Sequence, residues 1–169
     1  MRRHPLLLAL TCVLTLMACD SDEPCKLSLD EYEGPQGEAL VRHLIKTLPP
    51  IAPEVPKVYT AVKGPRLKST STAFVRRMAD LKVAFVSGEV LTMREPDKSI
   101  VDPRSGLSPV TLQIDELRVA GDGKWSALGG WAWKKTYERR RYSIHQTPSG
   151  YEVRDGERIE GNYAAPLAQ

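Results

Sequence analysis

After Lys82 the hydrophobic pattern changes to a period of two, and this change restricts the possible folds more than any other feature of the sequence. Apolar and polar residues alternate through four successive stretches, which are 82–95, 109–121, 124–138 and 140–154. Such alternation is typical of half-buried strands. The turn sequences DPRSG, GDGK and TPSG interrupt the pattern at short intervals, and strands joined by short turns run antiparallel. We therefore expect an antiparallel sheet in the second half of the chain.

Two irregularities are expected in this sheet. The apolar residues of 110–114 share one strand parity, whereas those of 117–119 share the other. An extra residue in one strand changes the parity in this way, so the pattern predicts a β-bulge near residues 115–116. The consecutive glycines Gly129 and Gly130 interrupt the next strand and predict a second bulge there.

The first half of the chain contains two helical patterns and one isolated strand. Residues 36–48 place apolar side chains at helical spacing and end at Pro49, and residues 69–81 repeat the pattern after good capping residues. Between them, the proline-rich stretch 49–56 is expected to be extended and the β-branched stretch 57–64 to form a strand. The whole pattern predicts an α+β fold with two short helices packed on a curved antiparallel sheet of four to five strands.

The N-terminus has the three parts of a secretory signal. A basic pair, Arg2 and Arg3, precedes the hydrophobic run from Leu6 to Met17, and the small residue Ala18 closes the segment. As a helix the hydrophobic run would span about 18 Å, which is shorter than the roughly 30 Å hydrocarbon core of a bilayer. The segment is therefore expected to direct targeting and not to span a membrane.

The residues Leu16-Met17-Ala18-Cys19 resemble the lipobox of bacterial lipoproteins. This resemblance implies that a lipid is attached to the Cys19 thiol and that residues 1–18 are removed as a lipoprotein signal peptide. Neither Cys12 nor Cys25 follows a small residue, so Cys19 is the lipidation site that fits. Two or three acyl chains hold a protein stably on a membrane, which would replace the missing span. The alternative is an ordinary cleaved signal that leaves Cys19 as a free thiol.

A lipidated Cys19 would place the chain on the bacterial cell envelope, facing the periplasm, with the lipid bilayer as its first partner. Asp20 resembles the sorting signal that keeps many enterobacterial lipoproteins in the inner membrane, but that rule varies among bacteria. Inner and outer membrane therefore both stay open. With Cys19 blocked, Cys25 has no partner in its own chain, so no internal disulfide is expected.

The chain after residue 18 is long enough for one domain with a substantial core. Residues 19–33 are rich in Asp and Glu and are expected to form an acidic flexible tether, because such a stretch buries too little apolar surface to offset its ordering entropy. Residues 34–158 are then predicted to be a single α+β domain and 159–169 a polar C-terminal tail. The formal charge of +3 falls close to neutral without the leader, which argues against a dedicated nucleic-acid binder.

The order of the expected elements and the final hairpin, GWAWKK…YSIHQTPSGYEV, resemble the nuclear transport factor two-like superfamily over about Gly34 to Val153. The resemblance implies a cone-shaped sheet. Functions in that superfamily range from isomerases to pure binding modules, so the resemblance does not select one. A cystatin-like or another helix-on-sheet arrangement is the alternative.

Few residues of the mature chain have the spacing that catalysis or metal binding requires. His43 and His145 lie far apart in sequence, and both are expected at ordinary surface or boundary positions. Ser87 and Ser105 lack the glycine-flanked elbow of a serine nucleophile. No phosphate-binding glycine motif occurs. We therefore expect no catalytic residue, no metal site and no cofactor.

The segment from Trp125 to Tyr142 is the most informative part of the mature chain. Trp125, Trp131 and Trp133 share one strand parity and would form an aromatic row, which is either a pocket or partner platform or the core face beneath the helices. Five cations follow closely and would form a basic rim; they are Lys134, Lys135, Arg139, Arg140 and Arg141. This rim would meet anionic headgroups or an acidic partner, or would be a solvated hairpin end.

These observations lead to one functional hypothesis and one alternative. The hypothesis is a membrane-anchored, periplasm-facing lipoprotein that is not an enzyme and binds another protein, in an envelope-assembly or immunity-type role. Its expected contact residues are Trp131, Trp133, Arg139, Arg140 and Arg141. The alternative is a small-molecule-binding protein or enzyme with an apolar cavity in the sheet. It requires a polar group inside, for which the candidates are Tyr59, Asp115 and Tyr137.

Overall fold

The computed structural model describes residues 31–164 of the chain. The predictions for the signal peptide 1–18, for lipidation at Cys19 and for the Cys25 thiol lie outside the described residues, as does most of the expected tether. Within the described range, no helix is both long enough and apolar enough to cross a membrane.

Four long strands form an antiparallel meander that makes up most of the sheet. They are β6 (Val110–Gly121), β7 (Lys124–Trp133), β8 (Thr136–Thr147) and β9 (Gly150–Gly161). Each pairs with the next in antiparallel register, and the predicted GDGK and TPSG sequences form two of the turns between them. The expected antiparallel sheet in the second half of the chain is thereby confirmed.

Strand β1 (Val58–Lys63) extends the meander beyond β6 and runs parallel to it. It also pairs with two strands of two residues each, β2 (Lys68–Ser69), which is antiparallel to it, and β3 (Ala84–Phe85), which is parallel. The sheet therefore has seven strands in the order β2-β1-β6-β7-β8-β9, with β3 beside β1. All residues of β1 are buried, as expected for a strand that is paired along both edges and covered by other elements.

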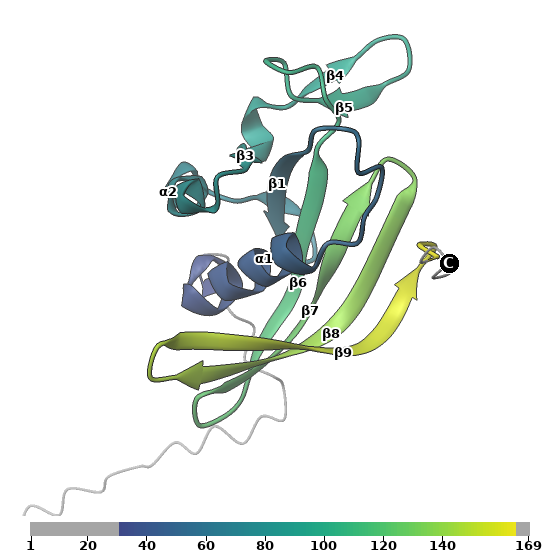
Figure 1. The fold of residues 1–169 in the computed structure, drawn as a ribbon. Coiled ribbons are helices and arrows are strands. Elements are labelled where there is room, and N and C mark those ends of the chain that lie inside the picture. The colour runs from purple at the N-terminus through teal and green to yellow at the C-terminus, as the bar shows by residue number, and fades with distance from the viewer. Residues whose placement is uncertain (1–30, 165–169) are drawn as a thin grey trace, which may run out of the picture.

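The strand count corrects the expectation of four to five strands, although the α+β class with two short helices on a mostly antiparallel sheet is confirmed. The stretch 82–95 is not one strand, because it breaks into β3, the 3₁₀ turn Gly88–Val90 and β4 (Thr92–Arg94). The Ser87 hydroxyl accepts a hydrogen bond from the Glu89 N–H at 3.3 Å and so caps this turn. Strand β4 pairs with β5 (Ser99–Val101) in a separate hairpin that projects from the body (Figure 1).

One of the two expected bulges is confirmed and the other is wrong. The register of β6 against β7 shifts at residues 114–116, which makes Asp115 the extra residue. At Gly129 and Gly130 the pairing of β7 with β8 continues without a shift. Gly130 instead allows the backbone of β8 to lie close to that of β7, since a Cβ on Gly130 would lie 2.0 Å from the carbonyl oxygen of Glu138.

The helix α1 (Pro35–Thr47) crosses the concave face of the curved sheet, and β9 bends around one side of it (Figure 1). It begins with Pro35 in its first turn and ends before Pro49, which confirms the predicted helix. Its inner face presents Leu40, Val41 and Leu44, which are buried. The spacing of these apolar residues therefore determines which side of α1 packs on the sheet.

The second helix, α2 (Thr72–Arg77), and the 3₁₀ turn Ala79–Leu81 that follows it cover the β1 side of the sheet. The Ser71 hydroxyl caps α2 by accepting a hydrogen bond from the Phe74 N–H at 3.2 Å. Phe74 and Met78 are completely buried in the same core as β1 and β6. The predicted second helix is confirmed.

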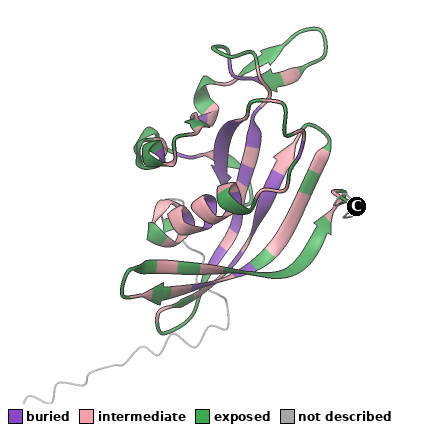
Figure 2. Cartoon of the chain, in the orientation of Figure 1, coloured by how far each residue is buried: buried purple, intermediate pink, exposed green. Residues whose placement is uncertain are grey.

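The core lies between α1 and the sheet, where Figure 2 shows buried residues on the inner side of α1 and along the central strands. Its fully buried side chains include Leu40, Leu112, Ile114 and Ile144. Burying each such side chain contributes about 1.5–3 kcal/mol. The inner face of the sheet beneath α1 is therefore filled with side chains.

The chain enters the fold earlier than the expected tether boundary allows. Residues Glu31–Glu33 form a 3₁₀ turn, and Tyr32 is 8 % exposed, with its hydroxyl 3.4 Å from the carbonyl oxygen of Asp115. The Glu33 carboxylate bonds to the Lys63 ammonium and accepts the Ser71 N–H at 2.7 Å. Assigning residues 31–33 to a flexible tether was therefore wrong, because an aromatic anchor and a paired carboxylate give this acidic segment its place in the fold.

The other predicted boundary is corrected as well. Strand β9 continues to Gly161, beyond the residue 159 at which the polar tail was expected to begin. Tyr163 then packs edge-on against Trp131, with ring centroids 5.4 Å apart. Aromatic packing keeps this part of the tail on the domain.

Candidate functional site

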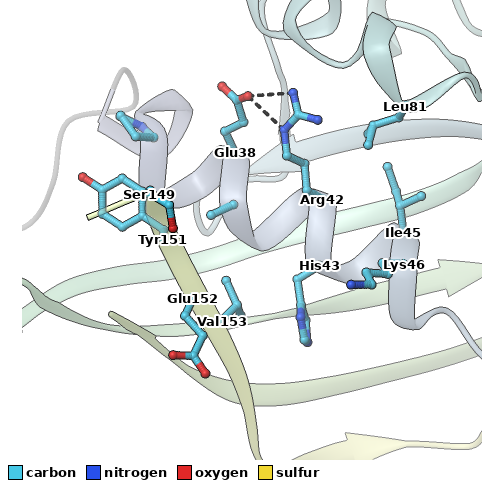
Figure 3. Close-up of a pocket in the computed structure, with 13 residues that line it drawn as sticks. Glu38, Arg42, His43, Ile45, Lys46, Leu81, Ser149, Tyr151, Glu152 and Val153 are labelled. Carbon is cyan, nitrogen blue, oxygen red and sulfur yellow. Dashed lines mark hydrogen bonds and ion pairs between the residues drawn. The ribbon is translucent and has the colours of Figure 1, made fainter. Parts of the chain in front are cut away.

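An open groove of about 920 Å³ lies over the outer face of α1. Figure 3 shows α1 beneath it, with Leu81 on one side and the first residues of β9 on the other. Its apolar surface includes Ile45, Leu81 and Val153, and Tyr151 adds an aromatic ring. A hollow of this volume is within the usual range for ligand clefts.

The charged side chains on the α2 side of the groove form one network. Arg42 donates to Glu38 at 2.9 Å and to Asp80 at 2.8 Å, and Arg77 donates to the same Glu38 at 2.9 Å. The bond to Asp80 raises the pKa of Arg42, and the reciprocal contact lowers the pKa of the exposed Asp80 carboxyl. These contacts link α1 to α2 and fix that wall. Lys46, farther along α1, is exposed and forms no ion pair within residues 31–164.

His43 lies between the groove and a second, smaller pocket. Its Nε2 is 2.6 Å from Oδ1 of Asp155 on β9, and its ring meets the edge of the Tyr142 ring at 5.9 Å between centroids. His43 lines the groove, whereas Asp155 and Tyr142 line the pocket. The His43–Asp155 contact therefore joins the middle of α1 to β9. No sequence pattern indicates it, because 112 positions separate the two residues.

The second pocket, of about 250 Å³, lies between the end of α1 and strands β7 to β9. We call it the tyrosine pocket; the residues that define it are Trp131, Glu138, Arg140, Tyr142, Arg158 and Tyr163. Glu138 is held between the two arginines, because Arg140 Nε donates to one carboxylate oxygen at 2.5 Å and Arg158 Nε lies 3.8 Å from the other. Burial, and then the negative charge of Asp155, raise the pKa of Tyr142.

The three tryptophans of the expected aromatic row all pack on the core, which favours the core-face interpretation of that row. Trp131 is only 3 % exposed. The prediction that its ring contacts a partner at the surface is therefore corrected, because the ring is buried. Trp133 is half-buried, and its Nε1 donates to the Ser108 carbonyl oxygen at 3.2 Å. The Lys134 ammonium lies 4.5 Å from the Trp133 ring centroid. Of the predicted aromatic contacts, Trp133 keeps accessible surface.

The arginines 139–141 do not form a single basic rim, because alternate residues of a strand point to opposite faces. Arg140 faces the concave side, where it lines the tyrosine pocket. Arg139 therefore points to the other side, where it donates to Asp115 at 2.8 Å and pairs with Glu160. Arg141 is exposed on that same side. The expected rim is thus divided between two faces, and part of its charge is compensated.

The three polar groups considered for an internal cavity line neither the groove nor the tyrosine pocket. Tyr59 is a core residue with 9 % exposure, and Tyr137 is 37 % exposed. Asp115 is buried at the bulge of β6, where burial raises its pKa and the Arg139 guanidinium opposes that shift. The carboxyl of Asp115 is therefore committed to a structural ion pair.

The other candidate residues have local roles. His145 is half-buried on β8, with neighbours of opposite parity in the core, as the alternation predicts. Ser105 donates to Asp102 at 2.6 Å within a turn, and Ser87 caps its own turn. Among the residues that the structure describes, no three His, Cys, Asp or Glu side chains are grouped to hold a metal ion.

Comparisons with protein-family models, with curated proteins and with solved structures find no match to this chain.

Proposed function

We propose that this chain is a membrane-anchored lipoprotein that faces the periplasm, is attached to the lipid bilayer through an acylated Cys19 and acts by binding another protein. The lipobox residues Leu16-Met17-Ala18-Cys19 support the anchor. The groove over α1 supports the binding role. An envelope-assembly or immunity-type role suits both features.

The contrast between a filled sheet interior and an open groove is the observation that carries the binding role. A small-molecule-binding protein or enzyme with an apolar cavity, which is the alternative, needs free space beneath α1. Side chains such as Leu40, Leu112 and Ile144 fill that space. The groove instead offers apolar side chains flanked by charged ones, and such a surface suits a segment of a partner protein.

The binding role can be tested by crosslinking the full chain in the envelope of its native bacterium, extracting it in detergent and capturing it together with any crosslinked partner. In this experiment Ala39→Arg is expected to reduce the amount of partner recovered with the chain at least tenfold. Ala39 lines the groove from α1, so a long cation there obstructs the groove. The variant keeps a good helix former, which limits the change in unfolding free energy to about 0.5 kcal/mol.

Arg141→Glu is the matched control, because Arg141 is exposed on the opposite face of the sheet. It also tests the contact role expected for that residue from the sequence. Equal recovery by Ala39→Arg and the parent chain would remove the groove from the proposal. Loss of the partner with Arg141→Glu alone would move the binding surface to the other face.

A further inference from the structure

We propose that the tyrosine pocket binds a carboxylate group carried on a compact aromatic or apolar body. This site lies beyond the groove, on the other side of the His43–Asp155 contact. The proposal does not depend on a protein partner or on the membrane anchor.

Two phenol hydroxyls of the pocket lack a protein partner. The Tyr163 hydroxyl is buried and has no hydrogen-bond partner in the described structure. Tyr142 is 5 % exposed, and its hydroxyl makes no hydrogen bond to any residue of 31–164. Tyr142 lines the pocket together with Asp155, Arg140 and Glu138. A buried hydroxyl without a partner, such as that of Tyr163, costs free energy, which a ligand that bonds to it would recover.

Hydrogen-bond donors outnumber acceptors in the pocket. Arg140 uses its Nε for Glu138, which leaves both of its Nη groups without a partner among the described residues. Arg158 uses one Nη for two backbone carbonyls and leaves the other. Glu138 is already shared by these two arginines, and Asp155 is engaged by His43. A ligand that fits this arrangement supplies acceptor oxygens.

A single negative charge fits the pocket better than two. The two arginines share one carboxylate, Glu138, and Asp155 brings the formal charge of these four lining groups to zero, so one bound carboxylate leaves a single net negative charge in the pocket. A dianion would meet repulsion from Glu138 and Asp155, both of which line the pocket. The planar guanidinium of Arg140 matches the geometry of a carboxylate.

The size and walls of the pocket define the rest of the ligand. A volume of about 250 Å³ admits only a small molecule or one end of a larger one. Trp131, Tyr142 and Tyr163 supply aromatic walls, and Leu44 adds an aliphatic one. Such walls favour a ring or a short apolar chain next to the carboxylate.

Benzoate is the probe for this proposal, and benzamide is its uncharged match. Calorimetric titration of the full chain in detergent should show saturable binding of benzoate and at least tenfold weaker binding of benzamide. Tyr142→Phe keeps the ring and removes one hydrogen-bond donor, so it should weaken the binding of benzoate at least fivefold. Tyr137→Phe removes a phenol outside the pocket and should bind benzoate as the parent chain does.

A parallel titration with N-acetylphenylalanine distinguishes the two sources of such a carboxylate. Tighter binding of benzoate assigns the site to a free small acid, and tighter binding of N-acetylphenylalanine assigns it to the end of a peptide chain. If Tyr142→Phe does not fold, Tyr163→Phe replaces it with the same expected loss. Absence of saturable benzoate binding, equal affinities for benzoate and benzamide, or full affinity in the folded tyrosine variant would overturn the proposal. Partner capture by the groove is unaffected by any of these outcomes.

Discussion

Replacing Trp131 with alanine is expected to lower the free energy of unfolding by about 4 kcal/mol, whereas Trp133→Ala should lower it by about 1–2 kcal/mol. The two indoles lie two positions apart on β7, and sequence alone treats them as equivalent. Trp131 is 3 % exposed and packs against Tyr163, so its removal leaves a cavity. Trp133 is half-buried, so solvent fills part of the space that its ring leaves.

Urea unfolding followed by circular dichroism measures this difference, provided that the slope of the unfolding free energy against urea concentration is the same in both variants. Domains of this size are stable by about 5–15 kcal/mol, so Trp131→Ala is close to the limit of folding if the parent chain lies at the lower end of that range. If it does not fold, Trp131→Phe keeps part of the packing and should lose about half as much. Equal and small losses in both variants would contradict the burial of Trp131 and return its ring to the surface role that the sequence suggested.

Lys63→Met is expected to destabilise the domain by about 3 kcal/mol, because it leaves the largely covered Glu33 carboxylate without its cation. The Lys63 and Glu33 side chains are only 9 % and 11 % exposed. Glu33→Gln still accepts the Ser71 N–H and should cost less. In the double variant no buried charge remains, so its loss should be smaller than the sum of the two single losses. If the loss in the double variant, measured by thermal or urea unfolding, equals the sum of the two single losses, the ion pair is contradicted.

The same pair predicts how stability depends on pH. Burial alone would raise the pKa of Glu33, but the hydrogen bonds from Lys63 and Ser71 outweigh it, and the pKa falls below the ordinary value of 4.5. The folded state therefore binds fewer protons at this site than the unfolded state. This stabilisation is fully present above about pH 4.5 and is lost as the pH falls through the lower folded value. In Glu33→Gln the free energy of unfolding should lose less as the pH falls below about 4.5 than it does in the parent chain. The same pH dependence in both chains would contradict this assignment.

Local patterns in the sequence predicted the parts of the fold that depend on neighbours in the chain. Helical spacing before Pro49 predicted α1, capping residues and helical spacing in 69–81 predicted α2, and the change of parity predicted the bulge near residues 115–116. The parallel pairing of β1 with β6 could not be predicted in this way, because alternation within a strand does not identify its partner. The stretch 82–95 was misread because its alternation continues through a capped turn.

Less of the candidate site could be predicted from the sequence, because local patterns do not identify contacts between residues far apart in the chain. The His43–Asp155 contact and the tyrosine pocket both join α1 to β9, and such pairings arise only from tertiary packing. Consecutive arginines were read as one surface, although strand geometry sends Arg139 and Arg140 to opposite faces. Strand parity predicts that division of the arginines, just as it predicts the shared face of the tryptophans.

Lipid attachment at Cys19 is the claim on which the membrane-anchored role depends most directly. Intact mass and fragment-ion spectrometry of the chain extracted from the native membrane measures it. We expect a mature chain that begins at Cys19, with lipid on the cysteine thiol and an acyl chain on its amine, and we expect neither group in Cys19→Ser. A chain that keeps its leader, begins at another residue or carries an unmodified Cys19 would contradict the account.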